Sequence, residues 1–130
     1  MVLVFSAEWC GICQSLVPYE RLMLDLYKNW PFAILGVETG SSRDVMLKAK
    51  TEQGLTYRSW WDGTDEEGPG PIATAWNAGG FPAVYVLDGK GVIRFVDTRH
   101  EDLLKAVRQL LTEHVAQSEL ASRGGAKPGL

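Results

Sequence analysis

Cysteine and histidine are scarce in this chain of 130 residues, which contains two of each. Two cysteines are too few for the disulfide framework of a small secreted scaffold. They also supply only two of the four ligands that a closed zinc site needs. His100 and His114 are fourteen residues apart, nearly four turns of the helix predicted there, so they lie too far apart along it to bind one metal. We therefore expect neither a metal nor a cofactor.

Long apolar runs and an excess of positive charge are also lacking. No apolar run approaches the roughly 20 residues that a membrane-spanning helix needs. The net charge of −3 gives no electrostatic reason to bind nucleic acid or an anionic membrane surface. We therefore expect no nucleic-acid partner and no membrane contact by this domain. The length suits one globular domain that buries its own core.

The chain begins without the features of a signal peptide. The apolar run at residues 2–5 follows Met1 directly, with no charged region and no small-residue cleavage site. This pattern predicts a strand. The compartment stays open: cytoplasmic if nothing precedes this strand, and extracytoplasmic, in the periplasm, if an N-terminal segment is missing.

Apolar runs alternate with segments of helical periodicity in the first half of the chain. Residues 2–5 and 32–37 are continuous apolar runs, which suit strands buried on both faces. A helical pattern follows each run, and the two patterns end at residues 29–31 and at Gly54. Strand–helix–strand units of this kind imply parallel strands with right-handed crossovers.

The second half adds an edge strand, a hairpin and a final helix. The patterns predict strands at 57–61, 83–87 and 92–96 and helices at 71–77 and 101–116. Residues 117–130 lack an apolar stripe and are expected to be a disordered tail, so the predicted domain spans residues 1–116. Because a hairpin is antiparallel, the sheet must be mixed, and the fold class is α/β.

Two adjacent tryptophans occupy the predicted strand at 57–61. Successive side chains of a strand point to opposite faces of the sheet. We therefore expect one of Trp60 and Trp61 to lie in the core.

Cys10 and Cys13 lie where a buried strand gives way to a helix. The free amides and the dipole of a helix N-terminus stabilise a thiolate there, and the thiolate is the nucleophile. Cys10 would then attack a disulfide, and Cys13, one turn further on, would resolve the mixed disulfide. A purely structural bridge over so short a loop would stabilise little. The placement favours a redox pair.

The segment FSAEWCGIC resembles the active-site segment of the thioredoxin superfamily. Pro18 matches a proline inside the helix that follows, and GGFPAVYVLDGKGVIRF is similar to the region where these proteins carry a cis-proline before a hairpin. The resemblance covers residues 2–115. The extra length at 51–76 is similar to the TlpA-like thiol:disulfide reductases and the related thiol-specific peroxidases.

The resemblance implies a three-layer α/β/α fold with a central mixed sheet and an extra strand and helix. The implied strand order places 32–37, 2–5, 83–87 and 92–96 side by side, with 57–61 outside 32–37. It also implies that Pro82 is cis and faces Cys10, whereas an ordinary trans proline is the alternative. The implied substrate-binding residues are Trp9, Gly11, Ile12, Phe81 and Pro82, with the Phe81 backbone pairing with an extended substrate segment.

This chain also departs from the family pattern. Val4 occupies the position where thioredoxins often carry a buried aspartate that relays protons to the second cysteine. Glu38 and Glu8 are the nearest carboxylates that could replace this aspartate. For each of them, the alternatives are a general base and a solvated surface charge. Ile12, between the cysteines, provides no charge that would stabilise the thiolate further, which argues against a strong oxidant.

These features predict a thiol:disulfide oxidoreductase, acting as a monomeric disulfide reductase through Cys10 and Cys13. Its partners would be protein disulfides or dithiols and an unidentified electron donor. A peroxiredoxin-like thiol peroxidase is one alternative, although Ala7 replaces the threonine expected there and Arg21 is the one arginine in the adjacent helix. A binding module without enzymatic activity is the other.

Overall fold

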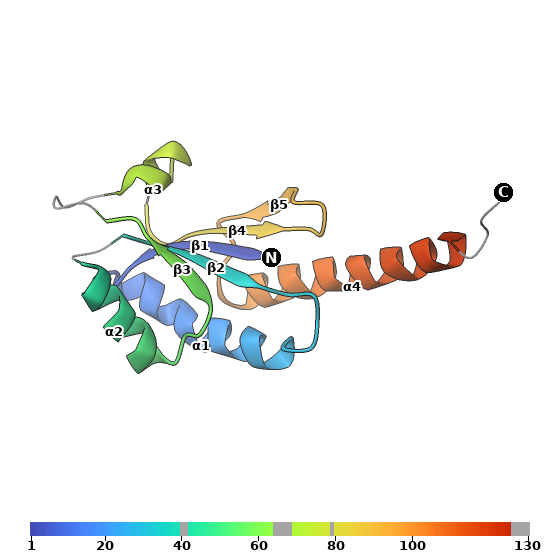
Figure 1. The fold of residues 1–130 in the computed structure, drawn as a ribbon, viewed down its shortest axis with the longest axis horizontal. Coiled ribbons are helices and arrows are strands. Elements are labelled where there is room, and N and C mark those ends of the chain that lie inside the picture. Colours follow the sequence, from blue (N-terminus) through green and yellow to red (C-terminus); the bar gives the residue numbers. More distant parts are fainter. Residues whose placement is uncertain (40–41, 64–68, 79, 126–130) are drawn as a thin grey trace.

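Strands and helices alternate along the computed structural model, which describes residues 1–39, 42–63, 69–78 and 80–125 (Figure 1). The elements are β1 (Val2–Ala7), α1 (Gly11–Leu26), β2 (Ile34–Thr39), α2 (Arg43–Gln53), β3 (Arg58–Trp61), α3 (Pro71–Ala75), β4 (Ala83–Leu87), β5 (Ile93–Val96) and α4 (His100–Gly125). This is the predicted order, with boundaries that differ by a few residues everywhere except at the end of α4.

The strands form one five-stranded sheet in the order β3-β2-β1-β4-β5. β1, β2 and β3 run parallel, whereas β4 is antiparallel to both β1 and β5. The parallel pairs are joined by the helices α1 and α2, because a parallel connection must cross over from one end of the sheet to the other. The predicted strand order is confirmed.

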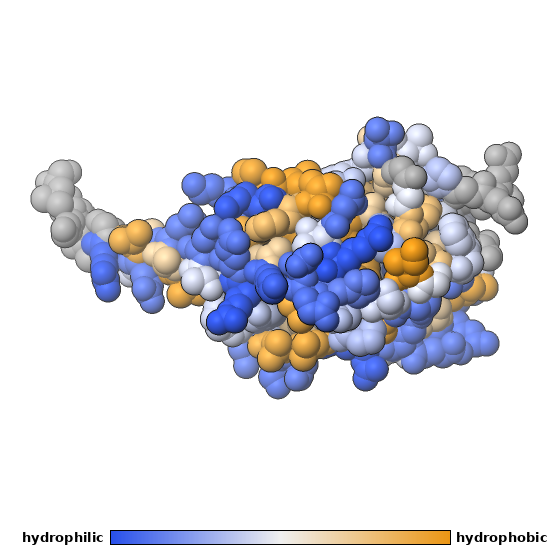
Figure 2. All heavy atoms as spheres, turned by 180° about the vertical axis from the view of Figure 1, so that it is seen from behind, coloured by the Kyte–Doolittle hydropathy of each residue, from blue (hydrophilic) through white to orange (hydrophobic). Residues whose placement is uncertain are grey.

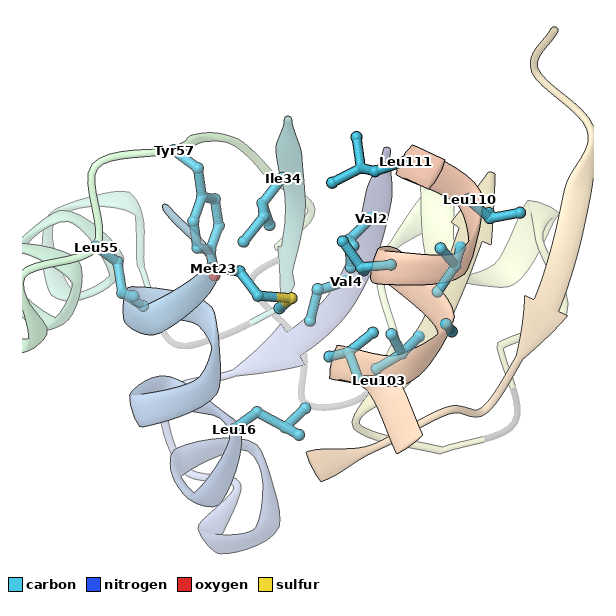
Figure 3. Packing of buried hydrophobic residues seen from close by; sticks show 14 residues of the cluster. Val2, Val4, Leu16, Met23, Ile34, Leu55, Tyr57, Leu103, Leu110 and Leu111 are labelled. Atoms are coloured by element: carbon cyan, nitrogen blue, oxygen red, sulfur yellow. The ribbon is translucent and has the colours of Figure 1, made fainter. Parts of the chain in front are cut away.

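Helices cover both faces of this sheet, with α1, α2 and α4 on one side and α3 on the other (Figure 1). The larger core lies between the sheet and the helices α1 and α4, where Leu16, Met23 and Leu103 are fully buried (Figure 3). A smaller core beneath α3 includes Phe5 and Ala73. The three-layer α/β arrangement expected from the sequence is therefore present.

Side-chain caps begin the two crossover helices. Cys10 has an extended backbone at the N-cap of α1, and its sulfur accepts a hydrogen bond from the Cys13 amide. Ser42 caps α2 through a hydrogen bond from Val45 N–H, and Gly54, at φ +67°, ends that helix in the left-handed conformation that glycine adopts without strain. The pattern that placed Cys10 at a helix start is confirmed.

The last helix is longer than the sequence patterns predicted. We expected it to end at Ala116 and to be followed by a disordered tail, but α4 continues to Gly125 and projects beyond the sheet (Figure 1). Residues 117–123 are exposed, so no apolar stripe marks them. A helix that has already formed extends through exposed residues of adequate propensity, so the predicted helix end at Ala116 was too early. Residues 126–130 lie outside the described part.

The prediction that either Trp60 or Trp61 is a core residue was wrong. Their exposed fractions are 51% and 39%. Both belong to β3, a short strand at the edge of the sheet with β2 as its one paired neighbour, so neither face of β3 is well covered. Residues 64–68 of the acidic loop that follows lie outside the described part.

Among the helices of the part of the chain that is described, none is both long and apolar enough to cross a bilayer. On the side of the molecule opposite to the view of Figure 1, hydrophilic residues cover much of the surface and apolar residues form separate small patches (Figure 2).

Candidate functional site

The two cysteines are joined by a disulfide bond at the amino end of α1. Their Cα atoms are 5.2 Å apart, and both residues are buried. The Cys13 amide nitrogen lies 3.1 Å from Cys10 Sγ. A backbone N–H at a helix N-terminus favours a negative charge on the atom that it faces, so this contact would stabilise a Cys10 thiolate once the disulfide is reduced.

The loop before β4 lies against Cys10. The Phe81–Pro82 peptide bond is cis, and the Phe81 carbonyl oxygen is 3.6 Å from Cys10 Sγ. The Trp9 ring packs edge-on against the Phe81 ring, with centroids 6.0 Å apart. The structure thus brings together Trp9, Cys10, Phe81 and Pro82, which the sequence analysis had singled out from two distant segments.

Exposed residues surround the buried sulfurs. Trp9 is 62% exposed and Ile12 is also exposed, while Gly11 faces open space. A substrate segment can therefore approach the disulfide over an apolar rim. Such a rim suits an extended polypeptide with apolar side chains better than a charged one.

Arg99, which the sequence analysis missed, supports the loop that carries the cis peptide bond. Its Nη2 donates a 3.0 Å hydrogen bond to the Pro82 carbonyl oxygen. The Nε2 atom of the next residue, His100, lies 2.9 Å from Ser15 Oγ in the first turns of α1. The start of α4 therefore contacts both segments of the site. Nothing in the sequence spacing indicates these contacts, which depend on how α4 packs.

Glu38 is buried and lines the same cavity as Cys13, so it is not the solvated surface charge that the sequence left as an alternative. It is 9% exposed, and Ser6 Oγ donates a 2.8 Å hydrogen bond to its Oε2. Burial raises the pKa of the Glu38 carboxyl, while the Ser6 hydrogen bond and the positive charge of Lys50 oppose that rise. Its proton affinity is thus higher than that of a solvated glutamate.

A second buried carboxyl group, Glu20, comes from α1. It is 3% exposed, and the Tyr57 hydroxyl donates a 3.0 Å hydrogen bond to its Oε2. Burial raises the pKa of Glu20 to about 7. The sequence carried a signal that was overlooked: Glu20 stands between Leu16 and Met23 at helical spacing, so it lies on the face of α1 that enters the core.

Lys50 places a positive charge near enough to interact with both carboxyl groups. Its Nζ donates to the Tyr57 carbonyl oxygen and, over 2.8 Å, to Ser59 Oγ. Burial lowers the pKa of Lys50, and the negative charges of Glu38 and Glu20 counteract this. Gly36 leaves room for the Ser59 and Tyr57 side chains, because a Cβ at residue 36 would collide with both of them.

A small cavity connects these polar groups with the second cysteine. Its volume is about 30 Å³, which is room for about one water molecule. Its lining includes Ser6, Glu8, Cys13, Glu20, Glu38, Lys50 and Tyr57. Cys13, but not Cys10, therefore lines a cavity that is rich in polar and ionisable side chains.

Two further features bear on the alternatives to a disulfide oxidoreductase: the position of Arg21 and the grouping of side chains that could bind a metal. The Arg21 guanidinium, considered for a peroxidase site, lies beside Gly54 at the end of α2. Over residues 1–39, 42–63, 69–78 and 80–125, no three or more His, Cys, Asp or Glu side chains are grouped so that they could hold a metal ion.

Comparison with known proteins finds thiol–disulfide oxidoreductases. No protein-family profile matches the chain. The thiol-disulfide oxidoreductase ResA of Geobacillus kaustophilus strain HTA426 is 27% identical over 94 residues, which cover 72% of this chain and 51% of ResA. ResA of Geobacillus thermodenitrificans strain NG80-2 is 24% identical over the same share of each chain. The chain thus spans about half the length of the curated relatives that it matches.

Solved structures of the same kind share the fold. The thioredoxin domain of a thiol-disulfide oxidoreductase from Bacteroides vulgatus superposes with a TM-score of 0.72 at 21% identity, covering 85% of this chain and 77% of that domain. A thiol-disulfide oxidoreductase from Bacteroides fragilis NCTC 9343 gives a TM-score of 0.68 at 25% identity, covering 85% of this chain and 80% of the other. The fold is thioredoxin-like, as the resemblance implied.

Proposed function

We propose that this chain is a thiol:disulfide oxidoreductase that reduces disulfides in protein substrates through Cys10 and Cys13. One observation carries the proposal: the disulfide between these residues lies at the amino end of α1 and against the Phe81–Pro82 loop. The likeness of the chain to thiol–disulfide oxidoreductases in sequence and fold supports it.

The reaction begins with the reduced pair. The Cys10 thiolate attacks one sulfur of a substrate disulfide, forms a mixed disulfide and releases the other substrate sulfur as a thiolate. Cys13 loses its proton and attacks Cys10 Sγ. The Cys10–Cys13 bond forms, and the bond between Cys10 and the substrate breaks. The second substrate thiolate leaves and takes a proton from solvent. The two electrons come from the cysteine pair, which a separate thiol donor must reduce again.

Glu38 is the residue that we propose as the base for Cys13. Both line the same small cavity, and burial raises the proton affinity of Glu38. Its place in the sheet fits this role. Val4 pairs with Gly36 and Ser6 pairs with Glu38, so Glu38 lies on the neighbouring strand and on the same face as Val4. The carboxylate that is absent at Val4 is thus supplied from β2.

The exposed rim and the loop before β4 would bind the substrate. Trp9, Gly11 and Ile12 form one side, and Phe81 and Pro82 form the other. An extended substrate segment would pair with the Phe81 backbone as an added strand. Pro82 has no N–H, so it leaves no unpaired donor facing the sulfurs. We propose that the protein binds such substrates as a monomer.

The test is insulin reduction in the presence of a thiol donor by the natural protein, Cys10→Ser and Cys13→Ser. Cys10→Ser should abolish the activity, because the attacking sulfur is gone. Cys13→Ser should accumulate a mixed disulfide between Cys10 and insulin, detectable by mass spectrometry without reductant. Full activity in both variants, each with the circular dichroism spectrum of the folded protein, would contradict the proposal.

A further inference from the structure

The Glu20 carboxyl is a buried ionisable group that the exchange reaction above does not use. It belongs to α1, two turns beyond Cys13, and it lines the same cavity as Cys13 and Glu38. Carboxyl groups are rarely buried without a partner. The partner of Glu20 is the hydroxyl of Tyr57, whose side chain reaches α1 from the segment before β3 (Figure 3).

The charges around the cavity do not balance if both carboxyl groups are ionised. Glu20 comes from α1, Glu38 from β2 and Lys50 from α2, and the charges of all three interact. Glu8, before α1, adds negative charge that acts on Glu38. Two carboxylates near one ammonium group leave an excess negative charge away from water. Binding one proton removes that cost.

We propose that Glu20 and Glu38 act as a coupled carboxyl pair that holds one proton beside Cys13, with Glu20 as the positioning residue that sets the basicity of Glu38. This inference rests on the proposed oxidoreductase function and on Glu38 as the base in it. When Glu20 ionises, its negative charge makes Glu38 a stronger base. The pair therefore links the rate of Cys13 attack to pH.

The proton balance of the resolving step follows from this arrangement. The Cys13 thiol gives its proton to the Glu38 carboxylate, directly or through one water in the cavity. The new thiolate forms the bond to Cys10 Sγ, and the substrate sulfur leaves with the electron pair of the broken bond. When a thiol donor reduces the disulfide again, the pair returns this proton to Cys13. No other oxidant, reductant or metal enters the step.

The groups around Glu20 set the pH at which the pair ionises. Burial raises the pKa of Glu20 to about 7, the Glu38 charge raises it further, and the Tyr57 hydrogen bond and the Lys50 charge lower it. Loss of the Tyr57 hydroxyl should therefore move ionisation of the pair to higher pH. Loss of the Glu20 carboxyl should leave Glu38 alone beside Lys50 and move its ionisation to lower pH.

These opposite shifts provide the test. The reduced protein is mixed with a small aromatic disulfide, 5,5′-dithiobis(2-nitrobenzoate), which releases one coloured thiolate when Cys10 attacks and a second when Cys13 resolves the mixed disulfide. The rate of the second release is measured against pH for the natural protein, Glu20→Gln and Tyr57→Phe. Glu119→Gln, an exposed glutamate on α4, is the matched control.

In the natural protein and in Glu119→Gln, the second release should accelerate as pH rises through neutrality. In Glu20→Gln this rise should move to lower pH, and the rate at alkaline pH should fall about tenfold because the base is weaker. In Tyr57→Phe the rise should move to higher pH. Coincident pH profiles, or shifts of both variants in the same direction, would overturn the inference.

The outcomes also separate this inference from the proposed function. If the natural protein gives no second release, or if Cys13→Ser still gives one, the exchange reaction itself is wrong. If the natural protein gives both releases and Glu20→Gln does not change the profile, the role of Glu20 alone is wrong.

A direct measurement does not depend on activity. Carboxyl carbon-13 NMR of the folded, oxidised protein should show one glutamate that titrates near pH 7, a signal that Tyr57→Phe moves to higher pH and Glu20→Gln removes. If Glu20→Gln does not fold, Tyr57→Phe still tests the inference, because phenylalanine keeps the packing of the ring. Titration of Glu20 at about pH 4.3, the value of a solvated glutamate, would overturn it.

Discussion

Ser6 on β1 and Glu38 on β2 are register partners, and the Ser6 hydroxyl donates a hydrogen bond of 2.8 Å to the Glu38 carboxylate. Parallel pairing of two buried strands therefore puts a hydroxyl donor beside a carboxylate in the interior. The hydrogen bond stabilises the ionised form of Glu38 while burial disfavours it. In the role that we propose for Glu38, the balance between these effects would keep a base available to Cys13.

Ser6→Ala should remove the hydrogen bond that stabilises the ionised form of Glu38. Without the hydroxyl, the pKa of Glu38 rises, so the second thiolate release in the exchange assay should accelerate at higher pH than in the natural protein. Loss of a hydrogen bond to a buried charge should also lower the free energy of unfolding by about 1–3 kcal/mol. The loss should be larger in alkaline than in acidic solution, because the bond matters most when Glu38 is ionised. Urea unfolding at two pH values checks this; equal losses at both would contradict it.

Glu20 should make the folded protein less stable as pH rises. Its pKa is raised from 4.5 to about 7 in the folded state, so between these values the folded state binds a proton that the unfolded state has lost. The free energy of unfolding should therefore fall across this interval, by about 3 kcal/mol from this group. In Glu20→Gln, the free energy of unfolding should fall less over this interval, because the contribution of the Glu20 carboxyl is missing. Urea unfolding of the oxidised protein at the two ends of the interval measures it, and an equal fall in both proteins would refute the prediction.

Arg99→Ala should loosen the loop that carries Phe81 and Pro82. The side chain donates a charge-assisted hydrogen bond to the Pro82 carbonyl oxygen, and its loss should lower the free energy of unfolding by about 1–2 kcal/mol. We expect the KM for insulin to rise more than kcat falls, because we propose that this loop binds the substrate. Arg99→Lys should restore part of the effect, and Arg108→Ala, an exposed arginine on α4, is the control. An unchanged KM in Arg99→Ala would show that the contact does not position the loop.

Trp9→Ala should weaken the reaction with a protein substrate and leave the free energy of unfolding almost unchanged. Because the Trp9 side chain is 62% exposed, its removal should change the free energy of unfolding by no more than about 0.5 kcal/mol. The kcat/KM for insulin should fall about tenfold, since exposed aromatic residues often dominate protein recognition. The reaction with the small aromatic disulfide should change much less. Trp30→Ala removes another exposed tryptophan, beyond the far end of α1, and should leave both reactions unchanged. Equal effects of the two variants would contradict a role for Trp9 in binding.

Local patterns in the sequence determined the order of elements and the position of the cysteine pair. Apolar runs mark β1, β2 and β4 because these strands are covered on both faces, and helical spacing marks α1 because one of its sides enters the core. The place of Cys10 between the first strand and the first helix follows from these two signals. Such features depend on neighbours within a few residues, so the sequence alone predicts them.

The polar interior was decided by the tertiary structure. The burial of Glu38 depended on how α1 and α2 pack against β2 and β3. The same packing brought Lys50 and Tyr57 to the cavity that Glu38 and Glu20 line. The contact between Arg99 and Pro82 likewise depends on where α4 begins relative to the loop before β4. Burial is a property of the assembled layers, and it is burial that changes the proton affinity of a carboxyl group. The sequence by itself therefore determined where the cysteine pair stands, and the packing of the helices on the sheet decided which groups line the cavity beside Cys13.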